Sequence, residues 1–168
     1  MTIRHVYPLS ALAGDYARAL AGVAVTGGPL LLGSPGSVMI WVLGTLAALF
    51  AAFGLRTGLR QLAPIEVSER GISAAGPFGA AIDWESLSVL RLHYYSLRRG
   101  RTRGDLGQGW MQATVSGGGR KIGFDSALEG FATVLRRVKI EAEKRGIVLD
   151  ADTRHNLDSL DAFEKAAP

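Results

Sequence analysis

A long uncharged segment constrains the fold of this chain more than any other feature. Between Arg18 and Arg56, the 37 residues from Ala19 to Leu55 include no charged side chain. A helix on the surface of a soluble domain needs a polar face toward water, and this segment offers none. We therefore predict that the first third of the chain lies in a membrane. A signal peptide is the alternative, but its apolar core is only about 7–15 residues long.

The apolar segment divides at the sequence LGSPGS, residues 32–37. Glycine and proline stop helices, so we expect two helices, residues 16–32 and 38–55, joined by a tight connection. About 17 residues is near the lower limit for crossing the hydrocarbon core, so the first helix is short. Small residues at four-residue spacing would let the helices approach closely, although alanine and glycine are also simply abundant here. The candidate packing residues are Ala24, Gly28, Gly44, Ala48 and Ala51.

The charges that flank the two predicted helices indicate their orientation. Arginines occur only on the side of the chain termini, and the connection carries no charge; the flanking arginines are Arg4, Arg18, Arg56 and Arg60. The positive-inside rule then places both termini and the rest of the chain in the cytoplasm. Trp41 lies one turn inside the second helix at its outer end, where an interfacial anchor is expected.

After Arg60 the hydrophobic pattern changes to the period of two that is typical of strands. We expect strands at residues 65–69, 71–75, 80–84 and 89–97, then a hairpin that turns at residues 117–119. In the strand at 89–97, Leu90, Leu92 and Tyr94 should share one face. In the hairpin the predicted inward positions are Met111, Ala113, Val115, Ile122 and Phe124. The pattern predicts about six strands in meander order.

A helical period of 3.6 follows the last predicted strand. Ser126 and Glu129 have the spacing of a capping box, which predicts that a helix starts at Ser126. Its apolar stripe should pack on the sheet; the stripe consists of Leu128, Phe131, Leu135, Val138 and Ala142. A shorter helix is expected at about residues 152–163, with Leu157 and Leu160 facing inward. The fold class is therefore α+β.

These elements give four regions. They are an N-terminal tail at 1–15, a two-helix hairpin at 16–55, a domain at 56–150, and a C-terminal helix and tail at 151–168. A meander closed by one helix resembles the pleckstrin-homology-like (PH-like) arrangement. The chain is also similar to bacterial PH-like membrane proteins in the segments IEVSERGISA, IDWESLSVLRL and GRKIGFDSALEGFATVLRR. The resemblance implies an antiparallel β-barrel or sandwich on a membrane anchor, and it implies no catalytic residue.

Few residues suggest catalysis or metal binding. The chain has no cysteine, which excludes disulfides, thiolate zinc sites and cysteine nucleophiles. His5, His93 and His155 have no metal-ligating partner three or four residues away. We predict no catalytic, cofactor or metal site, and an enzyme is the remote alternative. For Trp84 and Trp110, core or rim packing is expected rather than ligand stacking.

Four arginines fall within six residues between two predicted strands. They are Arg98, Arg99, Arg101 and Arg103. Basic residues near an anionic leaflet contribute about 1 kcal/mol each, so these are candidate contacts for anionic lipid. An acidic partner protein could use the same charges, and a solvated loop is the third possibility. Nucleic acid is not expected, because Tyr94, Tyr95 and Trp110 flank the loop rather than form a stacking platform.

The sequence therefore predicts a non-catalytic protein anchored in the bacterial inner membrane. Its cytoplasmic PH-like domain would bind a protein partner or anionic lipid headgroups, in a scaffold, accessory or assembly role. The alternative is a structural subunit that contacts a larger membrane complex through its hairpin.

Overall fold

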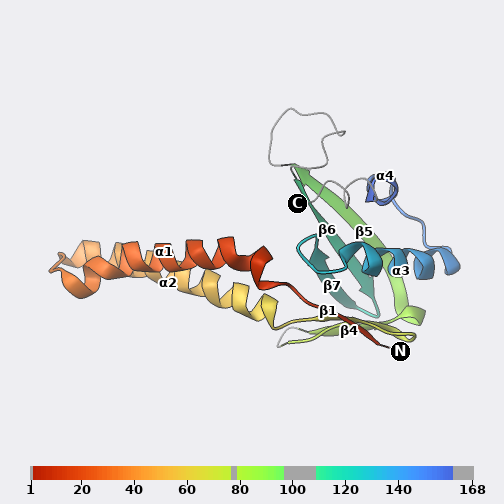
Figure 1. Cartoon of the computed structure of the whole chain (residues 1–168), viewed down its shortest axis with the longest axis horizontal. Helices are drawn as coiled ribbons and strands as arrows, with labels where there is room; N and C mark the ends of the chain where they lie inside the picture. Colours follow the sequence, from red (N-terminus) through yellow and green to blue (C-terminus); the bar gives the residue numbers. More distant parts are fainter. Residues whose placement is uncertain (1, 77–78, 97–108, 161–168) are drawn as a thin grey trace. The chain divides into compact units, whose positions relative to one another are not determined.

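The computed structural model describes residues 2–76, 79–96 and 109–160, which form two compact units. The helical unit is Tyr7–Ala63. The α+β unit combines the chain up to Val6 with the chain from Pro64 onward. The described residues include four α-helices and two antiparallel sheets (Figure 1), so an α+β fold is confirmed.

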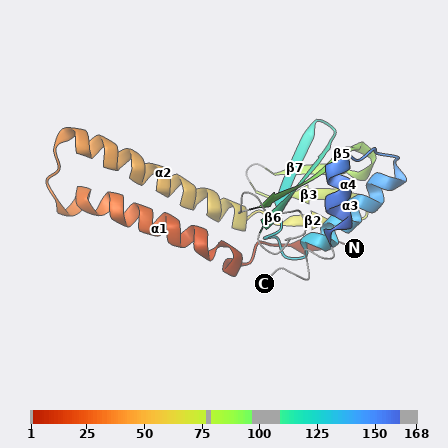
Figure 2. The same ribbon diagram turned by 90° about the horizontal axis from the view of Figure 1, so that it is seen from above.

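The helical unit consists of α1 (Leu9–Leu32) and α2 (Ser37–Gln61), which lie side by side (Figure 2). Both helices are longer than the sequence predicted. Helix α1 begins directly after Pro8, seven residues before residue 16, and it continues through Pro29. The predicted short first helix is therefore wrong, because a helix does not have to stop where charged side chains such as Asp15 and Arg18 begin; these two pair at 2.9 Å on its surface.

The contact between α1 and α2 follows a seven-residue spacing. On α1 the buried residues are Leu12, Ala19 and Thr26. The ring of Phe50 occupies the space where Gly22 lacks a side chain. This spacing is that of a coiled-coil seam, in which residues seven apart return to the same face.

The candidate packing residues do not form this seam. Ala24, Ala48 and Ala51 are exposed, and no neighbouring atom lies within 4 Å of the place where a Cβ on Gly28 or Gly44 would sit. The prediction of α1–α2 packing through these five residues is therefore wrong. These residues lie on other faces of the two helices, away from the contact between α1 and α2.

Most large apolar side chains of the helical unit point outward. The most exposed of them include Leu20, Val25, Leu31, Leu32, Val38, Trp41 and Leu55. In the part of the chain that the structure describes, α2 is the one helix long and apolar enough to cross a membrane by length and composition. None of its most apolar 18-residue window is buried.

The first sheet of the α+β unit has four strands in the order β1-β2-β3-β4. They are β1 (Ile3–His5), β2 (Ile65–Val67), β3 (Gly71–Ala74) and β4 (Ala80–Asp83). Strand β1 corrects the prediction that residues 1–15 form a tail. A three-residue strand is too short to show a period, so only its pairing reveals it. The helical unit is thus inserted between two hydrogen-bonded neighbours, β1 and β2.

The second sheet has three strands in the order β5-β6-β7. They are β5 (Leu87–Ser96), β6 (Gly109–Gly117) and β7 (Arg120–Asp125), and a single-turn 3₁₀-helix, Trp84–Ser86, precedes β5. The five predicted inward positions are confirmed, since each is at most 2% exposed; they are Met111, Ala113, Val115, Ile122 and Phe124. On β5, Leu90 and Leu92 are buried, whereas Tyr94 is partly exposed. The β6–β7 turn uses Gly118 and Gly119 with positive φ.

Helix α3 (Phe131–Lys144) packs on this sheet through Phe131, Leu135, Val138 and Ala142 of the predicted stripe, all of which are buried. The fifth stripe residue, Leu128, is also buried but lies in the turn before the helix. The capping-box prediction is wrong, because α3 starts after Gly130 in the left-handed conformation. The hydroxyl of Ser126 instead accepts a hydrogen bond from the N–H of Met111, at 3.2 Å. Ser126 therefore fixes the end of the sheet and not the start of the helix.

Helix α4 (Ala151–Asp158) covers the edge of β5. The N–H of Leu92 donates to Thr153 Oγ1 at 3.0 Å, and Asn156 Nδ2 donates to the carbonyl of Leu92 at 2.7 Å. These two side chains satisfy the outward backbone groups as a neighbouring strand would. Leu157 and Leu160 are buried, as predicted.

Candidate functional site

The four candidate arginines, Arg98, Arg99, Arg101 and Arg103, lie outside the described residues. Their contact with lipid or with a partner stays a prediction. The ends of β5 and β6, between which this segment runs, are described. They carry Tyr95 and Trp110, which pair directly across the two strands.

Tyr95 and Trp110 stack on each other. Their ring centroids are 4.5 Å apart with an interplanar angle of 18°, and the two residues are 42% and 40% exposed. The sequence predicts that both residues flank the loop rather than stack, whereas the two rings stack on each other. The buried residues Leu92 and Ala113 pair across the same two strands, and the register that joins them also places Tyr95 opposite Trp110.

The exposed face of β5 continues from Tyr95 to two basic side chains. His93 lies 6.4 Å from Tyr95 between ring centroids, and Arg91 is exposed on the same face. The pKa of Asp150 is lowered, first by the hydrogen bond from the Thr153 backbone N–H and then by the Thr153 hydroxyl. Electrostatic interaction with His93 and Arg91 lowers the pKa of Asp150 further.

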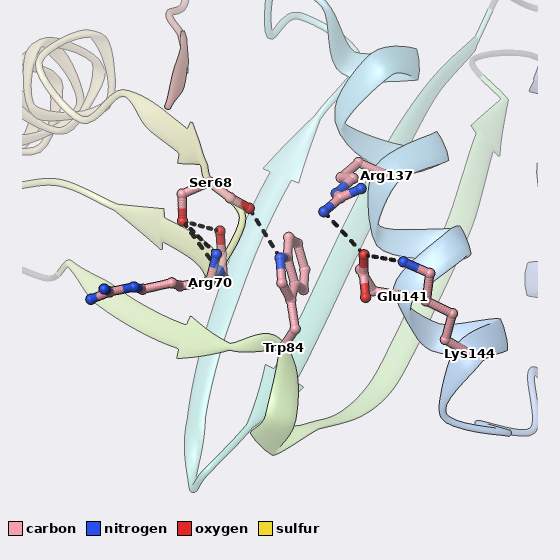
Figure 3. A network of polar contacts seen from close by, with 7 residues as sticks. Ser68, Arg70, Trp84, Arg137, Glu141 and Lys144 are labelled. Carbon is pink, nitrogen blue, oxygen red and sulfur yellow. Dashed lines mark hydrogen bonds and ion pairs between the residues drawn. The ribbon is translucent and has the colours of Figure 1, made fainter. Parts of the chain in front are cut away.

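A second candidate region is an open groove of about 760 Å³ beside Trp84. It is lined by Glu69, Arg70, Asp83, Trp84, Glu85, Ser86 and Glu141. Trp84 is 5% exposed, and its Nε1 donates to the carbonyl of Ser68 at 3.0 Å (Figure 3). The expected core or rim packing of Trp84 is confirmed, since its side chain is buried.

The wall of this groove holds a network around a buried carboxylate. Glu141 contacts Arg137 at 3.1 Å and Lys144 at 2.9 Å, all on α3 (Figure 3). The Arg137 guanidinium lies 6.0 Å from the centroid of the Trp84 ring. Two cations compensate the buried charge, which is the usual arrangement for a structural ion-pair network. The network links α3 to the Trp84 region.

The titratable side chains do not gather into a metal site within the ranges described. No group of three or more His, Asp or Glu residues is placed to hold a metal ion there. His5 lies in β1, His93 in β5 and His155 in α4. The Nδ1 atom of His5 is 2.9 Å from the carbonyl oxygen of Glu129, so this ring links β1 to the turn before α3.

A comparison of the chain with protein-family models, with curated proteins and with solved structures gives no match. No relative therefore assigns a ligand or an activity to these residues.

Proposed function

We propose that this chain is a non-catalytic binding protein anchored in the bacterial inner membrane. Helices α1 and α2 form a transmembrane hairpin, and the α+β unit is a PH-like domain at the cytoplasmic face. The domain contacts anionic lipid headgroups or a protein partner through the arginines at residues 98–103. The observation that carries the proposal is the outward apolar surface of a helical unit inserted between two paired strands.

The outward apolar surface favours lipid as the surroundings of the helical unit. Leu31 and Leu32 are 86% and 92% exposed, and Trp41 is 77% exposed. Soluble monomers rarely expose one continuous apolar surface of more than a few hundred Å². In hydrocarbon the same side chains are favourable, and the backbone of each helix is satisfied internally.

The position of β1 favours two crossings over one. Strand β1 precedes α1, β2 follows α2, and the two strands are hydrogen-bonded, with Ile3 opposite Val67. Both ends of the helical unit therefore lie on the same side of any membrane. A chain that leaves and returns on one side crosses an even number of times, so α1 must cross if α2 does. At about 1.5 Å per residue, the 24 residues of α1 extend about 36 Å, enough for the hydrocarbon core.

The charge distribution supports cytoplasmic ends for the hairpin. The connection at residues 33–36 has no charged side chain, whereas Arg56 and Arg60 lie near the end of α2. Arg60 stacks over the ring of Tyr7 at 4.3 Å, so an amphipathic ring and a cation lie together at this end of the hairpin. Both residue types are enriched where membranes meet the cytoplasm.

A PH-like domain agrees with the order of elements in the α+β unit. A sheet of four strands is followed by a sheet of three, and one amphipathic helix, α3, comes next. Helix α3 buries its stripe on the second sheet. We infer that this arrangement serves as a binding scaffold, in which the arginine segment connects the end of β5 to the start of β6.

The absence of native cysteine allows a direct test of topology. Ser34→Cys lies in the connection and Ala75→Cys lies after β3, and both positions are exposed. With a membrane-impermeant maleimide on spheroplasts, we expect Ser34→Cys to react and Ala75→Cys to react only after lysis. If both react without lysis, or if the protein stays in the soluble fraction, the proposal fails.

The proposed contact of the four arginines with lipid or with a protein partner is tested by purifying the protein in mild detergent. Mass spectrometry then identifies the lipids and proteins that co-purify. The variant has Ala at Arg98, Arg99, Arg101 and Arg103, and the matched control has Lys at the same four positions. Loss of phosphatidylglycerol only in the Ala variant supports lipid binding, and loss of a stoichiometric protein supports a partner. If the bound phosphatidylglycerol and the co-purified protein are the same in the two variants, the proposed arginine contact is wrong, and the proposed anchoring is unaffected.

A second candidate function is a structural subunit of a larger membrane complex. The outward positions of Ala24, Ala48 and Ala51 favour it, because small residues let another transmembrane helix approach closely. In this case a membrane protein co-purifies with both arginine variants, and Ala48→Leu releases it. Retention of that protein by Ala48→Leu would contradict contact at this face.

A further inference from the structure

The exposed aromatic pair at the ends of β5 and β6 has no role in the fold described above. Trp84, Phe124 and Phe131 are buried in the α+β unit, whereas Tyr95 and Trp110 are about 40% exposed. In the described part of this unit, the pair contributes its most exposed aromatic surface. The two rings therefore leave apolar surface exposed outside the hydrophobic core, where a binding partner could contact it.

The stacking geometry limits what this surface fits. The rings lie 4.5 Å apart and nearly parallel, so each covers one face of the other. A nucleobase stacks on a free aromatic face, and half of that surface is already used. The outer face of each ring and the ring edges remain, and the edges include the Trp110 N–H and the Tyr95 hydroxyl. Amphipathic rings of this kind concentrate at the boundary between hydrocarbon and lipid headgroups.

We propose that the Tyr95–Trp110 pair is an interfacial membrane contact, with its ring edges at the headgroup level of an anionic bilayer. The proposal rests on the membrane anchoring proposed above, since the anchor keeps a bilayer within reach of the domain. Arg91 shares the exposed face of β5. The chain between Ser96 and Gly109 carries four arginines, which suit anionic headgroups.

A bilayer fits this surface better than a folded protein partner does. A stable protein interface covers about 800 Å² on each side. The pair is a small apolar spot, and its neighbours on the same face, Gln112 and Thr114, are polar. Two rings suffice for a membrane contact, because the tethered bilayer is present at high effective concentration.

Tryptophan fluorescence of the full chain in nanodiscs tests the contact. The discs contain phosphatidylcholine and phosphatidylglycerol, with a spin-labelled lipid that quenches near the headgroups. The Trp41→Phe background removes the tryptophan expected in the bilayer, and Trp84 is buried. We expect the spin-labelled lipid to reduce emission in this background, and the reduction to disappear when Trp110→Phe is added. In neutral discs the reduction should be smaller.

A complementary variant separates this contact from anchoring. Trp110→Phe alone keeps Trp41, whose emission should be quenched if the hairpin is embedded. Quenching of Trp41 without quenching of Trp110 overturns the aromatic contact and leaves the anchor intact. Quenching of neither tryptophan contradicts the anchoring itself. Access of acrylamide to Trp110 in the discs, together with no lipid quenching, also overturns the contact and leaves a protein partner for the pair.

Discussion

The helical unit and the α+β unit place their apolar side chains in opposite directions. In the α+β unit, Leu92, Met111 and Val138 have no measurable exposure. In the helical unit, leucine and valine side chains are mostly exposed and the buried seam contains small or polar residues such as Ala19 and Thr57. The two units therefore have different ratios of buried to exposed apolar surface, which is the difference expected of two units in different solvents under the proposed membrane anchoring.

The buried hydroxyls show the same contrast. Thr57 on α2 donates to the carbonyl of Phe53 in its own helix, at 3.0 Å, so no water is needed. Thr153 on α4 accepts from a strand 61 residues away in the sequence. A buried polar group in the helical unit is thus satisfied locally, whereas in the α+β unit it holds distant elements together. Four predictions follow from this contrast, from the largest effect to the smallest.

Truncation of the α+β core should have the largest effect. Phe124 is 2% exposed and packs edge-on against Phe131 at 5.8 Å. Phe124→Ala should lower the free energy of unfolding of the α+β unit by about 3–5 kcal/mol. Denaturant unfolding in detergent, followed by the fluorescence of Trp84, measures this change. Leu55→Ala is the control, because Leu55 is 67% exposed and its truncation should leave this unfolding unchanged.

A charge on the outward face of α2 should oppose membrane insertion. Leu49 lies at the middle of α2 and is 61% exposed. Leu49→Arg should cost about 3 kcal/mol of insertion free energy at the helix centre. Maleimide labelling of Ser34→Cys reports the inserted fraction. Leu62→Arg, just beyond the end of α2, should insert normally. Normal insertion of Leu49→Arg would show that this face does not meet lipid.

Removal of one hydroxyl should open the edge of β5. Thr153→Val keeps the shape of a fully buried side chain but leaves the Leu92 N–H without its acceptor. We expect a loss of about 1–3 kcal/mol, because a buried donor is left unsatisfied. Hydrogen exchange should accelerate at Leu92. Thr133→Val, at an exposed position of α3, serves as the matched control. Unchanged exchange would mean that the edge is held by Asn156 alone.

The smallest effect concerns the N-cap of α4. Asp150 accepts from the Thr153 N–H at 2.6 Å, and its pKa is lowered from the usual value of 3.8. Because the folded-state pKa is lower, the cap stabilises α4 above about pH 4. This stability is lost as the pH falls through the folded-state pKa.

Hydrogen exchange in α4 between pH 3 and pH 6 measures this loss. Asp150→Ala should cost about 0.5–1 kcal/mol at neutral pH, near the low end for caps because Asp150 is exposed. Asp150→Asn keeps a capping oxygen and should remove the pH dependence. A pH dependence that persists in Asp150→Asn would assign it to another carboxylate.

The strands and the core of the α+β unit could be predicted because their signals are local. Alternation along β6 and β7 predicted inward positions that are all buried, such as Val115 and Ile122, and the stripe of α3 followed from its period. Leu87, a buried residue of β5, was missed because it lies before the stretch in which the alternation is visible. The start of α3 could not be predicted, because Ser126 bonds to Met111, 15 residues earlier in the chain. Strand β1 depends on a partner about 60 residues away, and three residues carry no period of their own.

The candidate site was predictable in part. The arginines are visible as a cluster in the sequence, but the Tyr95–Trp110 stack requires the register of two strands. In the helical unit, alanine and glycine occur on every face, so composition could not select the seam. Gly22 was missed because its role depends on Phe50, which meets it from the opposite helix.

The insertion of α1 and α2 between β1 and β2 has a consequence for biosynthesis. Ile3–His5 emerges from the ribosome first, but its partner Ile65–Val67 is made about 60 residues later. At about 5–20 residues per second, that interval is about 3–12 s. The first sheet therefore cannot close until the whole helical unit has been made. Under the proposed membrane anchoring, this interval is the time in which the hairpin can begin to insert while β1 still lacks its partner strand.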